Sequence, residues 1–158
     1  MKTNLETTTV KDISYLINSA CLKAPCGTSL EKLAGMLCTS DRHKVYLENG
    51  AGELTGIIQA KQIAMKVLGL AKQKADEEDM LPAIAYVLNS QCGQDIAEQA
   101  VTVERDTLLK AVLELMEQNH IREIAVVDES RRFMGTLEAK NILSHYLHAI
   151  AETNLKGA

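Results

Sequence analysis

Two histidines and a glutamate near the carboxyl end of the sequence are the side chains best suited to chemistry. His145, His148 and Glu152 stand at i, i+3 and i+7, so they share one face of a predicted helix. Imidazole and carboxylate groups bind divalent metals, and such a site could support an enzyme. The His-x-x-x-His spacing of metal-binding helices is not present here, however. A solvated helix face is therefore the expected structure, and we predict no metal site.

The cysteines are the second group of reactive side chains. Cys21 and Cys26 lie five residues apart and could form a redox or metal pair, while Cys38 and Cys92 stand far from them. Four thiols at such irregular spacing do not form a disulfide framework. We expect reduced thiols and a cytoplasmic protein, with Cys21 and Cys26 as small buried side chains.

Composition narrows the function further. The 158 residues carry a net charge of −4 and contain no Trp, one Phe and four Tyr, so neither a basic nor an aromatic surface for nucleic acid is expected. No apolar run is long enough to cross a membrane, and no apolar signal core follows Met1. No Gly-rich phosphate loop, nucleophile elbow or pair of acidic catalytic residues is recognisable. We therefore expect a protein that is not an enzyme and that binds neither nucleic acid nor membrane.

The chain repeats itself at an offset of 79 residues. Residues 22–70 align with residues 101–149 without a gap. Identical residues include Gly56 with Gly135 and Lys61 with Lys140, and the apolar positions agree almost throughout. A duplicated unit indicates two copies of one fold packed together, with a functional site expected in the cleft between them.

Each copy predicts the same order of elements, β-α-β-β-α. Strands are expected at 21–24, 43–48 and 53–58 in copy one and at 101–104, 123–128 and 132–137 in copy two. The first helix of copy one is expected to begin with a capping box of Thr28 and Glu31, and Asp106 or Thr107 is expected to cap its counterpart. Asn49-Gly50 predicts a hairpin turn. Closing helices are expected from residue 60 past 70 and from residue 139 past 150.

Between the copies lies an acidic run, Asp76-Glu77-Glu78-Asp79, expected to form a solvated loop or a frayed helix end. A short helix should follow it, with Pro82 in the first turn. The predicted organisation is therefore a first repeat at 8–75, a linker with a short helix at 76–92 and a second repeat at 93–152. The segment Lys11-Asp12-Ile13 before copy one is echoed by Gln94-Asp95-Ile96 before copy two.

This duplicated unit resembles the cystathionine-β-synthase (CBS) domain, of which two in tandem form a Bateman module. Residues 122–143 carry most of the likeness, residues 43–64 are their equivalent, and the resemblance extends from about Asp12 to Ala149. It implies an α/β (α+β) fold of two pseudo-symmetric CBS repeats packed as one Bateman module. It also implies a homodimer formed through helices and a regulatory ligand such as AMP, ADP, ATP or S-adenosylmethionine.

The resemblance also implies a set of ligand-binding positions. Where nucleotide-binding members place Ser or Thr and then Asp after the strand glycine, this sequence has Gln59 and Gln62 in copy one and Glu138 and Asn141 in copy two. Neutral amides can still bind a ribose hydroxyl, whereas Glu138 would repel a phosphate unless a cation neutralises it. The full predicted set is His43, Lys44, Gln59, Lys61, Gln62, Arg122, Glu138, Lys140 and Asn141.

Two hypotheses follow. The first is a sensor that binds an adenosine-type nucleotide or other small anionic ligand between its repeats, centred on His43, Lys44, Lys61 and Gln62, and that acts on an unknown partner protein. The alternative is a ligand-free dimeric scaffold for protein–protein interaction, favoured by the departures at Glu138 and Asn141.

Overall fold

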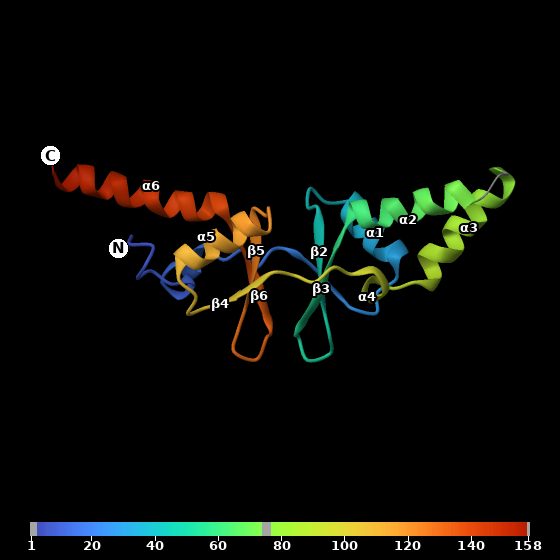
Figure 1. Cartoon of the computed structure of the whole chain (residues 1–158), viewed down its shortest axis with the longest axis horizontal. Helices are drawn as coiled ribbons and strands as arrows, with labels where there is room; N and C mark the ends of the chain where they lie inside the picture. Colours follow the sequence, from blue (N-terminus) through green and yellow to red (C-terminus); the bar gives the residue numbers. More distant parts are fainter. Residues whose placement is uncertain (1–2, 74–76, 158) are drawn as a thin grey trace. The chain divides into compact units, whose positions relative to one another are not determined.

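The computed structural model describes residues 3–73 and 77–157, which form two compact units (Figure 1). The first-repeat unit contains residues 21–100, and the second-repeat unit contains residues 1–20 together with 101–158. None of the described helices has the length and apolar character that a membrane crossing requires.

The first-repeat unit is a three-stranded sheet with helices. Its strands are β1 (Leu22–Pro25), β2 (Lys44–Glu48) and β3 (Leu54–Gln59), with β1 parallel and β3 antiparallel to β2. Its helices are α1 (Leu30–Cys38), α2 (Ala60–Gln73), α3 (Glu77–Ser90) and α4 (Gly93–Ile96). The sheet order is β1-β2-β3.

The second-repeat unit has the same topology. Its strands β4 (Thr102–Glu104), β5 (Glu123–Val127) and β6 (Phe133–Glu138) pair in the order β4-β5-β6, again with one parallel and one antiparallel ladder. Its helices are the 3-10 helix η1 (Val10–Leu16), α5 (Leu109–Gln118) and α6 (Ala139–Lys156). The predicted β-α-β-β-α order is confirmed in both repeats.

Each unit has its own apolar core. In the first-repeat unit, Leu30, Leu33 and Leu37 line one face of α1 and pack on Val45 and Leu47 of β2. In the second-repeat unit the corresponding stripe is Leu109, Val112 and Met116 of α5. The i, i+3 and i+7 spacing directs these side chains to one side, and burial of that side holds each helix on its sheet.

The same four-residue turn closes both hairpins. Asn49 Oδ1 accepts hydrogen bonds from the amides of Ala51 and Glu53, and Asp128 Oδ1 accepts them from the amides of Ser130 and Arg132. The second residue before the returning strand has positive φ in each turn: it is Gly52 (79°) in one and Arg131 (62°) in the other. The hairpin predicted at Asn49-Gly50 is confirmed, and the left-handed φ falls on Gly52, two residues later, where glycine is favoured.

The segment that precedes each repeat packs on the other repeat in the sequence. Val10 N donates to Thr107 O (2.9 Å) and Leu109 N to Thr8 O (2.9 Å), so η1 belongs with copy two. In the same way Gly93 N donates to Thr28 O (2.8 Å) and Leu30 N to Gln91 O (3.0 Å), so α4 belongs with copy one. Figure 1 shows the N-terminal segment (blue) beside α5 and α4 beside β3. The compact units therefore differ from the expected repeats at 8–75 and 93–152.

This exchange also explains why the predicted helix caps are wrong. Thr28 and Ser29 are held extended against residues 91–93, so α1 begins one residue late and Ser29 Oγ accepts from Lys32 N (3.3 Å). In copy two the N-cap is Leu108, which makes no side-chain cap and instead bridges Thr9. We call the segment that precedes each repeat its leading segment. In both helices the leading segment of the other repeat supplies the acceptor for the first amide, a role that a side chain usually fills.

Each leading segment is itself closed by an aspartate. Asp12 Oδ2 accepts from Thr9 N (2.9 Å), and Asp95 Oδ2 accepts from Cys92 N (2.8 Å). The hydrogen bonds from Cys92 lower the pKa of the Asp95 carboxyl, because they stabilise its charged form. The echo of Lys11-Asp12-Ile13 in Gln94-Asp95-Ile96 is thus the repeat of one short capped turn.

The linker prediction is partly wrong. α3 runs from Glu77 to Ser90, so most of the acidic run is helical and Pro82 lies inside the helix and not at its start. Glu78 and Asp79 stand in the first turn, where the helix dipole favours negative charge. Asp76 lies outside the described residues.

The equivalent strand glycines lie where the exchanged segments cross the sheets. A Cβ on Gly135 would lie 2.5 Å from Asn18 O and 2.9 Å from Ile17 Cγ2, and its φ is +144°. We expect Gly135→Ala to destabilise the protein by about 3 kcal/mol, because it combines a backbone clash with a strained φ. Urea denaturation followed by circular dichroism measures this change.

Gly35→Ala is the matched control, since a Cβ at that position of α1 meets nothing within 4 Å. It should stabilise the helix by up to about 1 kcal/mol. A loss below about 0.5 kcal/mol for Gly135→Ala would show that the segment at 17–18 does not cross β6 closely.

Candidate functional site

A hollow of about 450 Å³ opens at the start of α2 in the first-repeat unit. One wall comes from the β3–α2 junction. The other comes from residues 91–98, the segment that leads into copy two but packs on copy one, which we call the exchanged linker. Its lining residues are Gln59, Lys61, Gln62, Met65, Ile96 and Glu98. Three of these, Gln59, Lys61 and Gln62, belong to the predicted ligand-binding set.

Gln62 joins the two walls. Its Oε1 accepts from Gln59 N (2.6 Å) and its Nε2 donates to Ile96 O (2.8 Å). The amide therefore caps α2 and at the same time anchors the linker. These bonds use one acceptor site of Oε1 and one N–H of Nε2, so Gln62 holds the two walls together.

The linker wall is fixed by backbone pairing as well. Ile57 N donates to Glu98 O (2.9 Å) and Glu98 N donates to Ile57 O (3.0 Å). The neighbouring Gly56 leaves room for this approach, since a Cβ there would lie 2.8 Å from Ala97 Cβ. Glu98 is thus held in place although its side chain is exposed.

Lys61 and Glu98 carry the two formal charges of the lining, and both side chains are exposed. Within the described part of the chain neither takes part in an ion pair. The amino end of α2 adds partial positive charge from its free N–H groups. The hollow therefore offers one free ammonium group, one free carboxylate and an apolar surface at Met65 and Ile96.

The equivalent residues in the second-repeat unit are arranged differently. Lys140 Nζ lies 3.1 Å from Glu138 Oε2, and Asn141 Oδ1 accepts from Glu138 N (3.2 Å). The ion pair with Lys140 therefore reduces the repulsion expected from Glu138. Lys140 is the equivalent of Lys61, which has no such ion pair among the described residues.

The predicted basic pairs are not among the lining residues of the hollow. Lys44 is opposite Gln59 in the β2–β3 ladder, yet neither Lys44 nor the exposed His43 is among its lining residues. In copy two, Arg122 is exposed and its carbonyl accepts from Ala139 N (2.9 Å). That these residues contact a ligand stays a prediction.

The histidine face of α6 is not solvated as expected. His145 is 2 % exposed, and its Nδ1 lies 2.8 Å from Tyr15 Oη. His148, three residues on, is exposed, so the two rings do not share a surface. Among residues 3–73 and 77–157, no group of His, Cys, Asp and Glu side chains has the geometry of a metal site. His145 fastens η1 to α6.

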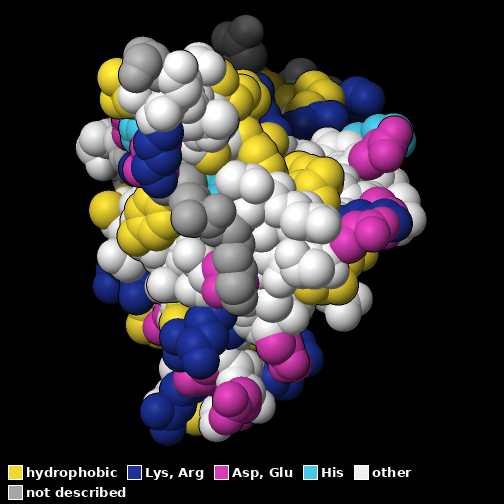
Figure 2. All heavy atoms as spheres, turned by 90° about the vertical axis from the view of Figure 1, so that its left-hand side faces the viewer, with side chains coloured by type: hydrophobic (Ala, Val, Ile, Leu, Met, Phe, Trp, Pro, Cys, Tyr) yellow, Lys and Arg dark blue, Asp and Glu magenta, His cyan; other side chains and the backbone are white. Residues whose placement is uncertain are grey.

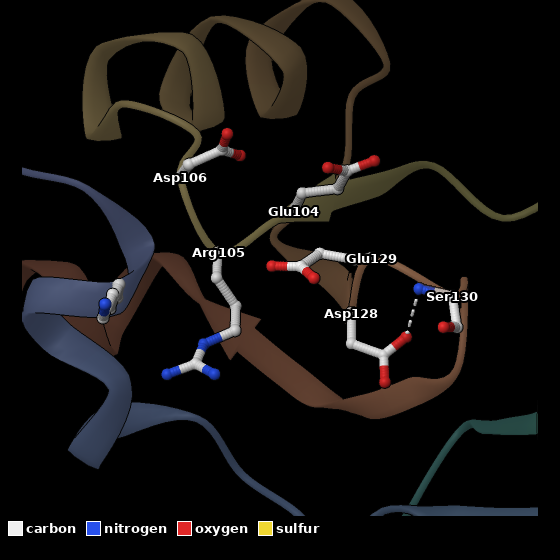
Figure 3. A pocket seen from close by; sticks show the side chains of 7 residues that line it. Glu104, Arg105, Asp106, Asp128, Glu129 and Ser130 are labelled. Atoms are coloured by element: carbon white, nitrogen blue, oxygen red, sulfur yellow. Dashed lines mark hydrogen bonds between the residues drawn. The ribbon is translucent and has the colours of Figure 1, made fainter.

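A second hollow, of about 420 Å³, lies in the second-repeat unit (Figure 3). Its lining residues are Lys11, Glu104, Arg105, Asp106, Asp128, Glu129 and Ser130. At the aligned positions of copy one these charges are missing: Pro25, Cys26, Gly27, Asn49, Gly50 and Ala51 stand there. The shared fold therefore does not require the charges. Asp128, however, is engaged in closing its turn, through the bond from Ser130 N that Figure 3 draws.

On the face drawn in Figure 2, Lys and Arg side chains alternate with Asp and Glu, and hydrophobic side chains lie between them. Such a surface produces no extended field of one sign on that side.

Known proteins resemble this chain mainly in structure. A comparison with curated proteins finds no match. The family model described as "CBS domain" matches residues 94–148. A CBS domain-containing protein of unknown function from Bacillus anthracis superposes with a TM-score of 0.68 at 19 % identity, covering 89 % of this chain and 94 % of that one.

Two further structures were solved with ligands. The CBS domain pair of protein MJ0100, in complex with 5′-methylthioadenosine and S-adenosyl-L-methionine, has a TM-score of 0.59 at 20 % identity, covering 90 % of this chain and 98 % of that one. The cytosolic domain of the Mg²⁺ channel MgtE, in complex with ATP, has a TM-score of 0.61 at 18 % identity, covering 82 % and 46 %.

The family model covers the second repeat, and the structural likeness covers both repeats with the same strand order in each. Residues 94–148 match the CBS-domain family model, and the chain as a whole has the fold of a tandem CBS-domain pair.

Proposed function

We propose that this protein is a regulatory module that binds a small adenosine-type or other anionic ligand in the hollow at the start of α2. The observation that carries the proposal is the unpaired Lys61 beside the amino end of α2, in a hollow whose walls are already fixed. Backbone N–H groups at a helix start favour anionic groups, and an adjacent ammonium group strengthens that preference. The adenosine-type ligands of MJ0100 and MgtE support this ligand class.

Binding would have a consequence beyond the hollow. A ligand there contacts both the β3–α2 junction and the exchanged linker, so it favours conformations in which the linker is docked. A ligand shifts an equilibrium only by its difference in affinity for the two states. We propose that the linker conformation is what a partner protein detects.

We further propose that the protein forms a homodimer through α6. Leu143, Leu147 and Ile150 are 57–60 % exposed and stand at i, i+4 and i+7, opposite the buried Ile142 and His145. α2 exposes Met65 and Leu68 in the same way. An exposed apolar stripe on a helix is typical of an interaction surface.

The ligand proposal predicts that Lys61→Ala weakens binding about tenfold, because the only ammonium group of the lining is lost. Isothermal titration calorimetry with AMP, ADP, ATP and S-adenosylmethionine measures this. Lys72→Ala, in the last turn of the same helix, is the matched control and should bind as the natural protein does. Flat titrations with all four ligands from a folded sample would refute the proposal and favour the ligand-free scaffold.

The dimer proposal predicts that Leu147→Glu produces a monomer, because a carboxylate would be buried in the apolar interface. Light scattering coupled to size-exclusion chromatography gives the mass. Leu81→Glu on α3 is the control: that side chain is 73 % exposed and lies off the stripe. A Leu147→Glu protein that stays dimeric would exclude α6 as the interface.

A further inference from the structure

We infer that Glu98 makes the hollow selective for adenosine-type ligands that carry a cationic or zwitterionic group, against nucleoside polyphosphates. This inference rests on the proposed function and names the ligand class of the same site. It depends on the charge balance of the lining, on the fixed position of Glu98 and on the comparison of the two repeats.

The lining residues carry no net formal charge. Lys61 supplies one positive charge and Glu98 one negative charge, while Gln59 and Gln62 are uncharged. A polyphosphate brings several negative charges to a hollow whose lining supplies one ammonium group and one carboxylate, and repulsion from that carboxylate costs affinity. A zwitterion places its own cation against Glu98 and its anion against Lys61.

The backbone of Glu98 is fixed beside the hollow. Both its amide and its carbonyl are bonded to Ile57, and a Cβ on Gly56 would lie 3.1 Å from its carbonyl oxygen. Two residues earlier, the bond from Gln62 holds Ile96. The Cα of Glu98 is therefore held at the linker wall, and its exposed carboxylate can rotate toward a ligand in the hollow.

The other repeat shows that the fold does not need this carboxylate. At the corresponding crossing in the second-repeat unit, Asn18 pairs with Thr136 through the same two backbone bonds, of 2.8 and 2.9 Å. A neutral side chain therefore satisfies the crossing equally well. What Glu98 adds is a free carboxylate at the hollow, where a ligand can use it.

The experiment compares affinities for S-adenosylmethionine and ATP in the natural protein, in Glu98→Gln and in Glu114→Gln. Glu114 is an exposed residue of α5 and serves as the charge-matched control. The natural protein should bind S-adenosylmethionine at least about tenfold more tightly than ATP. Glu98→Gln should reduce that ratio about tenfold, through weaker binding of S-adenosylmethionine and stronger binding of ATP, and Glu114→Gln should leave it unchanged.

Tighter binding of ATP by the natural protein, or an unchanged ratio in Glu98→Gln, would overturn the inference and leave the proposed function standing. Absence of binding to S-adenosylmethionine and ATP, with circular dichroism showing a folded protein, would overturn the inference, and flat titrations with AMP and ADP as well would overturn the proposed function.

Discussion

The backbone pairing between each leading segment and the repeat it joins is the interaction on which the rest of this structure depends. Two bonds, Gly93 N to Thr28 O and Leu30 N to Gln91 O, place the linker on the first repeat. They supply the acceptor for the first amide of α1, and they bring residues 96–98 to the start of α2. Without this pairing the hollow would have only one wall. The fold of the repeat and the candidate site are therefore consequences of the same exchange.

Local patterns in the sequence predicted the elements well, because strands and amphipathic helices are set by residues close together in the chain. The exchange was not predictable in that way, since periodicity does not say which copy a segment will pack on. One trace of it was visible: the leading segments repeat at an offset of 83, whereas the repeats themselves align at 79. Pro82 was misread for a related reason, because proline marks a helix start only when nothing upstream favours the helix.

In the candidate site, too, residues that are neighbours in the sequence were predicted and residues from a distant segment were not. Gln59, Lys61 and Gln62 follow one another along the chain, so a resemblance to a family could identify them. Ile96 and Glu98 come from a distant segment and were missed, since only the folded chain brings them to α2. The structure also separates two lysines that the sequence made equivalent. Lys140 is paired with Glu138, whereas Gln59 stands at the position equivalent to Glu138 in copy one and offers Lys61 no charge to pair with.

The most direct test of this account is a nuclear magnetic resonance titration of ¹⁵N-labelled protein with S-adenosylmethionine. If the exchanged linker forms a wall of the ligand site, the amide signals of Gln59, Lys61, Gln62, Ile96 and Glu98 should shift together, with a common affinity. Shifts confined to residues 59–62, with residues 96–98 unmoved, would contradict the claim that the linker builds the site.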